Sequence, residues 1–598
     1  MPQEKTDFSN SKTAHQWLKI GKKRRAGVLV PLFSIYSQNS VGIGEIPDIK
    51  LLVDWCTKVN ISIIQLLPLN DTGYNFSPYD AESSYALDPM YLSLSNIYGL
   101  ETNNFKNEID KLRRKFNIKN NRVNYEIKHE KLKLLKKMFD STYEMPSEFE
   151  EYKEKNKYWL RDYAIYKTIK DKFKQNSWEK WADPYKNLDN NTSTQLIKTE
   201  YRTVVFYEWL QWQLYIQMTD LKEYADEQDV FIMGDLPLLV SKDSADVWSK
   251  KEYYILDKCT GTPLDFEYIK GQRWGMPPYN WVKLENRDFN HIKERLKYAE
   301  NFYDIYRIDH FMGLFRLWVI DNKSPIELGG FEGKYIPENP ELWETQGLNI
   351  LNKMLESTSM LPCGENLGDV PECANNVLNN YLIPGLEIQR WTFKHIANKY
   401  NNISMLSTHD TSTFIDWWGN ECGTINSDFI KKLCDENELS YKSTINKLFD
   451  INNSAGKRLG WKENINTKEK MLKTLNLPFE KSGGFEYAYL NSYGEKQKFL
   501  EFLQFKELPE KNASKTLLFN ALKKSLDSNT IFSIQLILDW LELGDIFNNI
   551  KKSEPRINIP GTISGNNWTF AIPVPLEKFL DMTVNKTIID LNRSAHRT

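Results

Sequence analysis

The sequence predicts an α/β fold: a (β/α)8 TIM barrel whose loops carry large, mostly helical insertions. Short apolar, β-branched runs recur eight times, and long polar segments with helical periodicity separate most of them. Each run is apolar at nearly every residue, as is typical of strands covered on both faces. Eight such strands alternating with helices indicate a barrel of parallel strands. The predicted strands are residues 26–35, 61–69, 230–240, 302–310, 360–366, 385–393, 403–410 and 531–541.

Uneven spacing of the strands places three long insertions. Residues 95–228 form a Lys- and Glu-rich helical stretch far longer than one crossover helix, 420–525 is a second helical and polar insertion, and 241–290 is a loop-rich subdomain. Barrel enzymes build their sites from loops beyond the C-terminal strand ends, so these insertions would shape a substrate cleft. The expected layout is an N-terminal extension, the catalytic barrel and a C-terminal tail, over residues 1–25, 26–570 and 571–598.

Length and charge exclude some classes of protein. A chain of 598 residues suits one large domain with insertions or two to four domains. Lys plus Arg number 78 and Asp plus Glu number 80, for a net charge of −2. This balance argues against a general nucleic-acid binder. Aromatic residues make up 13% of the chain, including 18 tryptophans, which fits sugar binding as well as an aromatic-rich core.

Cysteine usage and hydropathy predict a cytoplasmic protein. The six cysteines form no C-x-x-C pair and no metal-ligand spacing, as expected for reduced thiols in a reducing compartment. The basic N-terminus is not followed by the apolar segment of a secretory signal. No apolar stretch approaches the roughly 18 residues of a membrane span, so we expect no membrane partner.

Residues 306–316, YRIDHFMGLFR, place Arg307, Asp309 and His310 in an apolar run. Buried charges are costly unless they are paired or have a chemical role. Alternate residues of a strand face the same side, so Arg307 and Asp309 point one way. We expect the guanidinium to lower the pKa of Asp309 and keep it ionised, as a covalent nucleophile requires. A structural salt bridge at a strand end explains the same pair.

Two further strand ends carry candidate residues. In LPCGENLGDVP (361–371) a strand ends at Glu365, and the flanking glycines allow a sharp turn that leaves this glutamate at the barrel mouth. A solvated carboxylate is the simpler explanation. In LSTHDTST (406–413) His409 and Asp410 follow an apolar strand, a pair that also fits metal ligands or a hydrolase triad. No H-E-x-x-H and no nucleophile elbow accompanies it, so we expect no metal.

Together the three acidic residues indicate more than each does alone. They lie at the ends of the fourth, fifth and seventh predicted strands and would converge over one barrel mouth. Two carboxylates acting as nucleophile and acid/base are the arrangement of retaining glycoside chemistry. A like-charged neighbour and partial burial would raise the pKa of Glu365 and keep it protonated while Asp309 stays charged.

Nine sequence motifs occur in a familiar order between about residues 24 and 570. They are RRAGVLVPLFSI, QLLPLNDTG, SPYDAESSYALDPMYLSL, GDLPLLVSKDSADVW, GQRWGMPPYNW, YRIDHFMGLFRLW, GENLG, STHD and RINIPGTISGNNW. In these motifs the chain resembles the 4-α-glucanotransferases, the amylomaltases and disproportionating enzymes of glycoside hydrolase family 77. The resemblance implies that Asp309 is the nucleophile, Glu365 the general acid/base, and Asp410 a third carboxylate that stabilises the transition state.

The resemblance also implies a set of substrate-binding residues. Arg307, His310 and His409 would hold the nucleophile and the sugar hydroxyls of the donor subsite, and Tyr79 and Asp235 would contact sugar.

On the acceptor side, Trp274 and Tyr279 would form part of a loop. Both are large apolar residues in a Gly/Pro-bounded segment, as in a lid that excludes water. Ordinary core packing of this loop is the alternative.

Three positions depart from the family pattern. Asn366 stands where Asp is common, Thr411 where Asn is common, and Met276 where small amylomaltases often have Asn. None of them removes a catalytic carboxylate. The longer chain is similar to the type-2 disproportionating branch, which uses maltose as donor and glycogen-like polymers as acceptors. That branch usually carries N-terminal starch-binding domains, and we expect none here because the predicted barrel begins at about residue 26.

We therefore expect a cytoplasmic 4-α-glucanotransferase that moves glucosyl or maltosyl units between α-1,4-glucans and needs no metal or nucleotide cofactor. Its partners would be malto-oligosaccharides and glycogen-like glucans, with no nucleic acid and no membrane; the oligomeric state is left open. Two alternatives remain. One is a retaining α-glucan hydrolase, and the other is a catalytically inactive glucan-binding protein on the same fold.

Overall fold

The computed structural model describes residues 8–142, 144–265, 267–393 and 400–598. At its centre is a sheet of eight parallel strands: β1 (Arg25–Val30), β2 (Ile63–Leu66), β3 (Phe231–Leu236), β6 (Ile305–Ile308), β9 (Leu361–Gly364), β10 (Leu386–Ile388), β11 (Ile403–Met405) and β15 (Phe532–Leu536). Their order is β10-β11-β15-β1-β2-β3-β6-β9. A parallel bridge between Gly364 and Gly385 joins the two edges, so the sheet is nearly closed into a barrel.

All eight predicted strands form, in the predicted order, and the barrel is confirmed. The strands are shorter than the apolar runs that predicted them. The run 385–393 divides into β10 and the short helix α14 (Gln389–Thr392), and the run 531–541 divides into β15 and α22 (Ile537–Glu542). A continuous apolar run does not by periodicity distinguish a buried strand from a buried helix.

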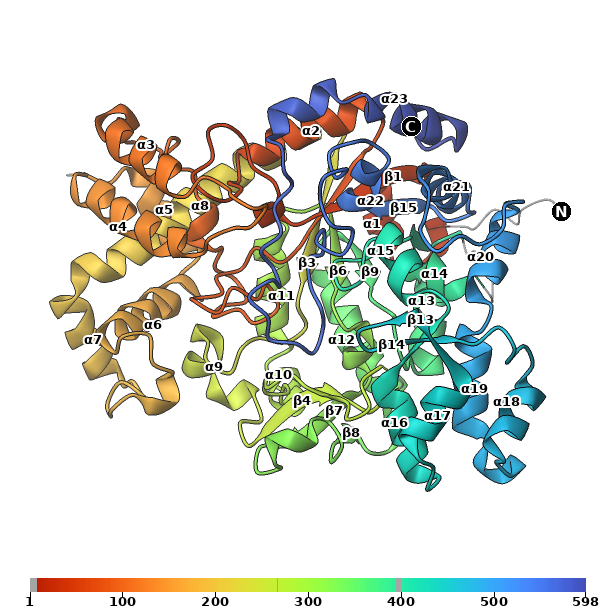
Figure 1. The fold of residues 1–598 in the computed structure, drawn as a ribbon. Coiled ribbons are helices and arrows are strands. Elements are labelled where there is room, and N and C mark those ends of the chain that lie inside the picture. The colour runs from red at the N-terminus through yellow and green to blue at the C-terminus, as the bar shows by residue number, and fades with distance from the viewer. Residues whose placement is uncertain (1–7, 143, 266, 394–399) are drawn as a thin grey trace.

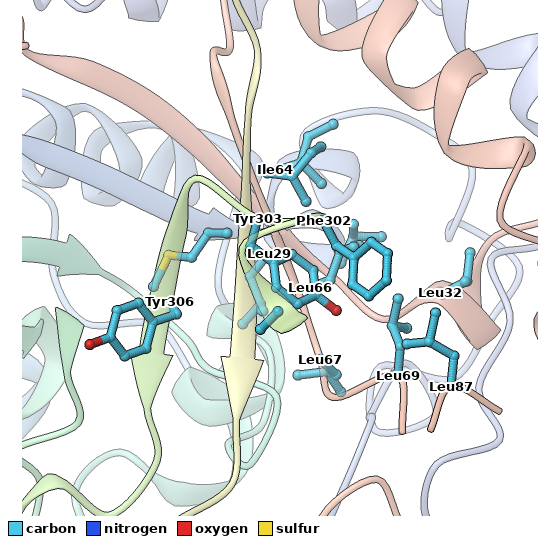
Figure 2. Packing of buried hydrophobic residues seen from close by; sticks show 14 of the residues in the cluster. Leu29, Leu32, Ile64, Leu66, Leu67, Leu69, Leu87, Phe302, Tyr303 and Tyr306 are labelled. Atoms are coloured by element: carbon cyan, nitrogen blue, oxygen red, sulfur yellow. The ribbon is translucent and has the colours of Figure 1, made fainter. Parts of the chain in front are cut away.

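Helices cover the outside of the barrel, with at least one following each strand. In strand order they include α2 (Asp48–Lys58), α8 (Tyr201–Glu227), α11 (Asn290–Ala299), α12 (Trp343–Ser357), α13 (Glu372–Tyr381), α14, α21 (Lys515–Leu526) and α23 (Val584–Ser594). Strand side chains pack between these layers, and Figure 2 shows Phe302 and Tyr303 close to Leu29 and Leu66 in this core. Gly234 in β3 gives the Tyr303 ring its room, because a Cβ there would lie 2.5 Å from the ring.

The first insertion is helical, as predicted, and lies to one side of the barrel (Figure 1). It contains α3 (Lys106–Lys115), α4 (Glu126–Asp140), α5 (Ser147–Lys155), α6 (Leu160–Lys172), α7 (Asn190–Thr199) and the long α8. Buried lysines hold it against the loop after β2. Lys128 on α4 lies 2.8 Å from both Asp71 and Asp88, and Lys167 on α6 lies 2.6 Å from Glu82. Buried ions need such partners, so the insertion fixes the loop that carries Tyr79.

The second insertion contains a small domain with its own core. Its helices are α16 (Ser427–Glu436), α17 (Tyr441–Leu448), α18 (Lys468–Leu475) and α19 (Gly483–Ser492). The sequence analysis expected helices here and missed a three-stranded antiparallel sheet of β12 (Thr424–Asn426), β14 (Arg458–Trp461) and β13 (Phe449–Ala455). Trp461, Phe449 and Tyr489 form the aromatic centre of this core.

The loop-rich segment 241–290 pairs with residues that follow the fourth barrel strand. β4 (Lys258–Thr262), β5 (Gln272–Arg273), β7 (Leu317–Asp321) and β8 (Lys334–Ile336) form a four-stranded antiparallel sheet in the order β5-β4-β7-β8. Short strands with this little apolar pattern give no periodic signal, and sequence analysis did not predict them. The sheet brings the Trp274 segment beside the barrel mouth.

Both terminal segments pack on the barrel. In the N-terminal segment, of which residues 1–7 lie outside the described part, α1 (Ala14–Ile20) places Trp17 against Phe532 at the start of β15, with ring centroids 5.9 Å apart. The predicted C-terminal tail contains α23, and Arg597 beyond it is buried and donates to the carbonyls of Arg25 and Thr530. Within the described residues, no helix has both the length and the hydrophobicity of a membrane span.

Candidate active site

The C-terminal strand ends bring the predicted residues together. Asp235 in β3 and Arg307 in β6 are paired in register, and Asp309 follows β6 directly. Glu365 follows β9 directly, and its backbone N–H donates to the carbonyl of Ile308 at 3.1 Å. Because parallel strands end at one face of a barrel, residues far apart in the chain meet there.

Arg307 is the centre of a cluster with the carboxylates of Asp235, Asp309 and Glu365. Its Nη1 donates to both carboxylate oxygens of Asp235, at 2.7 and 2.8 Å, and to Oδ1 of Asp309 at 3.0 Å. Its Nη2 lies 3.4 Å from Oε1 of Glu365. One guanidinium therefore contacts three carboxylates, and its closest contacts are with Asp235.

Glu365 is fixed from the neighbouring strand end. The backbone N–H of His310 donates to its Oε2 at 2.6 Å. His310 has a left-handed backbone conformation, with φ 50° and ψ 54°, directly after Asp309. This conformation is uncommon for residues other than glycine. The turn after β6 thus places Asp309 at the strand end and directs the His310 backbone N–H toward Glu365.

Tyr79 reaches the cluster from the loop after β2. Its hydroxyl donates to Oδ2 of Asp235 at 2.7 Å and lies 2.9 Å from Nε2 of His409. The Tyr79 and His409 rings are stacked with centroids 5.3 Å apart, and Trp568 packs against both. Sequence analysis did not single out Trp568, although it lies in the RINIPGTISGNNW motif.

Asp410 is held from another direction. Asn558 donates from Nδ2 to its Oδ1 at 2.7 Å, and the Asn558 backbone N–H donates to the carbonyl of His409. The turn itself is closed by Thr411, whose hydroxyl accepts from the Thr408 N–H at 2.9 Å. Asn558 is a site residue that sequence analysis missed; its motif was noted, but not its role.

Exposure separates the carboxylates into two groups. The side chains of Asp309, Glu365 and Asp410 are 24%, 21% and 42% exposed, whereas that of Asp235 is fully buried. The expectation that Asp235 contacts sugar is therefore corrected. Its buried carboxylate accepts hydrogen bonds from Arg307 and Tyr79 on both oxygens. Asp235 orients these two residues, and three carboxylates face the solvent.

Electrostatics correct a second expectation. Burial raises the pKa of Asp309 well above its ordinary value; Arg307 acts against this shift, while Glu365, Asp235 and Asp410 add to it. Burial likewise raises the pKa of Glu365 despite Arg307 and the His310 amide. The sequence predicted that Arg307 would lower the pKa of Asp309. The net shift is upward, because burial and the neighbouring carboxylates outweigh the single guanidinium that they share.

The two histidines of the site stay neutral near neutral pH. Burial, with a smaller contribution from Arg316, lowers the pKa of His310 to about 4. Burial is also the main cause that lowers the pKa of His409. A neutral imidazole both donates and accepts hydrogen bonds, which suits contact with hydroxyl groups. Among the residues with described positions, no group of three or more His, Cys, Asp or Glu side chains is arranged to hold a metal ion.

The structure separates Trp274 from Tyr279. Trp274 is partly exposed and makes an edge contact with His310, with ring centroids 4.9 Å apart, so it lies beside the cluster. Tyr279 is only 2% exposed and packs against Tyr254 and Trp281. The expectation that Tyr279 belongs to the lid is corrected, because its ring is part of the core.

Trp274 and Tyr279 therefore predict opposite phenotypes. For the glucanotransferase that the motifs predict, Trp274→Ala should raise the ratio of hydrolysis to transfer about tenfold, because losing about 1–1.5 kcal/mol of aromatic contact would weaken acceptor binding and admit water. Tyr279→Ala should leave that ratio unchanged and cost about 3–5 kcal/mol of stability. Glucose and oligosaccharide yields from maltotriose, together with thermal melts, measure both effects. A changed ratio only in the Tyr279 variant would contradict this assignment.

Fold and site together define a (β/α)8-barrel enzyme of carbohydrate chemistry, with several carboxylates gathered at the barrel mouth. The family model described as 4-alpha-glucanotransferase, glycoside hydrolase family 77, matches residues 30–576. The chain belongs to this family, as its motifs predicted, and its activity is the transfer of α-1,4-glucan units.

Individual relatives agree with this assignment. A 4-alpha-glucanotransferase of Chlamydia pneumoniae is 34% identical over 585 residues, 95% of either chain. The rice 4-alpha-glucanotransferase DPE2 is 31% identical over 405 residues, which cover 64% of this chain and 41% of the rice protein. The structure of a Streptococcus agalactiae amylomaltase in complex with acarbose superposes with a TM-score of 0.72 at 21% identity, over 96% of this chain and all of that one.

Proposed function

We propose that the enzyme transfers glucosyl or maltosyl units by double displacement, through a covalent glycosyl-Asp309 intermediate. The observation that carries the proposal is that one guanidinium, Arg307, contacts both Asp309 and Glu365. Such a shared contact favours the short carboxylate spacing of retaining enzymes over the about 6.5–9.5 Å that inverting enzymes keep for a water molecule.

In the first step, a carboxylate oxygen of Asp309 attacks the anomeric carbon of the donor. The glycosidic C–O bond breaks, and the leaving oxygen takes the proton of Glu365. In the second step, the 4-hydroxyl of an acceptor glucan attacks the same carbon and gives its proton to Glu365. The bond to Asp309 breaks as the new bond forms, so both carboxyl groups return to their starting states. The raised pKa of Glu365 suits this alternation between acid and base.

Asp410 and the neutral histidines complete the proposed machinery. Asp410 is ordered by Asn558 and faces the solvent side of the cluster, where its negative charge would stabilise an oxocarbenium-like transition state. His310, His409 and Tyr79 would contact hydroxyl groups of the donor sugar. Trp274 would line the acceptor side and keep water from the intermediate.

For donor preference, we propose the type-2 pattern, in which maltose donates one glucosyl unit to a polymer. Met276, Thr411 and the EIQRW segment of residues 387–391 favour it by their resemblance to that branch, and the rice relative bears the name DPE2. We predict that maltose alone releases measurable glucose and that glycogen or a long maltodextrin increases this release about tenfold or more, because extended acceptors add binding energy. Chromatography of the products, with maltotriose as positive control, measures it.

The same assay decides among the alternatives. Transfer conserves the number of reducing ends, whereas an α-glucan hydrolase increases it, and a binding protein without activity leaves maltotriose unchanged. If maltose stays inert with glycogen present while maltotriose gives a product ladder, the type-2 proposal fails and the enzyme is an amylomaltase of ordinary donor preference.

Asp235 predicts a specific pH dependence. Its negative charge contributes to the raised pKa values of Asp309 and Glu365 and occupies Arg307. Asp235→Asn removes that charge, so both pKa values should fall. The two limbs of the kcat/KM profile, which report the Asp309 and Glu365 pair in the free enzyme, should therefore both move to lower pH. A profile unmoved in the folded variant, or moved to higher pH, would contradict this electrostatic account.

A further inference from the structure

The loop that carries Asp410 is held just beyond the turn by hydrogen bonds to residues that follow the two neighbouring barrel strands. Ser412, Thr413 and Phe414 each make a hydrogen bond to a buried charged side chain, and these side chains follow β10 on one side and β15 on the other. The turn of residues 408–411 closes on itself through Thr408 and Thr411. Held at this end and closed on itself, such a turn has little freedom to move its carboxylate.

Arg390 holds this loop from the end of the sixth strand, β10. It lies on α14, directly after β10, and is 1% exposed. Its Nη2 donates to the carbonyl of Ser412 at 2.8 Å, and Nη1 lies 3.4 Å from the Ser412 hydroxyl. A guanidinium is costly to bury, and here both terminal nitrogens contact Ser412 of the Asp410 loop.

Asp539 and Glu542 hold this loop from the end of the eighth strand, β15. Both lie on α22, directly after β15, and are 0% and 5% exposed. Asp539 accepts from the backbone N–H of Phe414 at 2.8 Å, and Glu542 accepts from the Thr413 hydroxyl at 2.9 Å. Burial raises the pKa of both groups, and Asp539 raises that of Glu542 further.

We infer that Arg390, Asp539 and Glu542 are positioning residues for Asp410: they touch no substrate and act by fixing the loop on which this carboxylate is placed. The inference rests on the proposed role of Asp410 in the transition state. A displacement of about 1 Å at a reacting group costs up to about a hundredfold in rate. Loss of these hydrogen bonds to the Asp410 loop should therefore lower kcat and leave KM nearly unchanged.

The test uses the full-length enzyme with maltotriose as substrate. Asp539→Ala should lower kcat about a hundredfold with KM within about threefold of wild type. Asp539→Asn should restore most of kcat, because its carbonyl oxygen still accepts from Phe414 and a carboxamide replaces a carboxyl group of similar size. Asp545→Ala, which removes an exposed aspartate six residues further along, is the matched control and should match wild type.

A double-mutant cycle separates positioning from general destabilisation. If Asp539 acts through Asp410, Asp410→Asn and the double variant Asp410→Asn/Asp539→Ala should have the same kcat, since the effects of coupled residues do not add. Thr413→Val, which keeps the size of the side chain and loses its bond to Glu542, repeats the test if Asp539→Ala does not fold; it should lower kcat about tenfold.

The possible outcomes are distinct. The positioning inference is overturned if Asp539→Ala, or in its place Thr413→Val, keeps kcat within about threefold of wild type. It is also overturned if adding that substitution to Asp410→Asn lowers kcat by the same factor as in the wild-type background. If Asp410→Asn itself is fully active, the proposed role of Asp410 fails, and the inference fails with it. Inactivity of Asp410→Asn combined with normal turnover of Asp539→Ala overturns the positioning inference alone.

Discussion

Replacement of Asp309 by asparagine is expected to abolish transfer while leaving glucan binding in place. The carboxamide has nearly the same size and its carbonyl oxygen still accepts from Arg307 Nη1, which is 3.0 Å from the native carboxylate. It does not form the covalent glycosyl bond, because the amide oxygen is a weak nucleophile. We expect kcat on maltotriose to fall by at least about a thousandfold, with maltotriose affinity by titration calorimetry within about threefold of wild type.

The control for this variant is Asp288→Asn, which changes an exposed aspartate paired with Lys293 on the surface and should match wild type. Residual transfer by Asp309→Asn above about a hundredth of the wild-type rate would exclude Asp309 as nucleophile, since the loss of a covalent nucleophile is far more severe. Loss of binding together with activity would instead indicate that the charge of Asp309 is needed to order Arg307.

Replacement of Glu365 by glutamine should stall the reaction in a different place. With maltotriose, the leaving oxygen needs a proton that glutamine does not supply, so kcat should fall about 10²–10⁴-fold. With α-maltosyl fluoride, the leaving fluoride needs little protonation, so the bond to Asp309 should still form. The acceptor step lacks its base, and the glycosylated enzyme should accumulate.

Mass spectrometry of the intact protein measures this intermediate directly. Glu365→Gln incubated with α-maltosyl fluoride should gain the mass of one maltosyl unit, and a peptide digest should place it on Asp309. Wild type should turn over without accumulating the label, and the double variant Asp309→Asn/Glu365→Gln should not be labelled. Labelling of Asp309→Asn in place of Glu365→Gln would show that the two roles are reversed.

Environment, rather than residue type, separates the roles proposed for these two carboxyl groups. Asp309 makes its 3.0 Å contact with Arg307 from the end of β6, while Glu365 accepts a 2.6 Å bond from the His310 amide and only a longer contact from Arg307. A bound glucan would raise the pKa of whichever carboxyl group it buries more deeply. We therefore expect glucan binding to fix the final protonation pattern.

Sequence alone located the barrel and the open face of the site. The eight strands are contiguous apolar runs, which is a local signal, and barrel chemistry takes place at strand ends. Asp309, Glu365 and Asp410 could therefore be found among the residues at the C-terminal end of each run. Trp274 was predicted from the family resemblance of its Gly- and Pro-bounded motif, and it lies beside His310. These predictions needed no knowledge of which distant residues would become neighbours.

Tertiary structure decided everything that depends on such neighbours. Arg307 makes its closest contacts with Asp235, 72 residues away in sequence, and this contact limits what the guanidinium does for Asp309. Asn558 reaches Asp410 across 148 residues, and Tyr279 is buried by rings that no local pattern placed beside it. Burial, pKa and loop position are set by atoms within a few ångströms in space. A chain folded into a barrel takes those atoms from segments whose spacing in sequence carries no record of the contact.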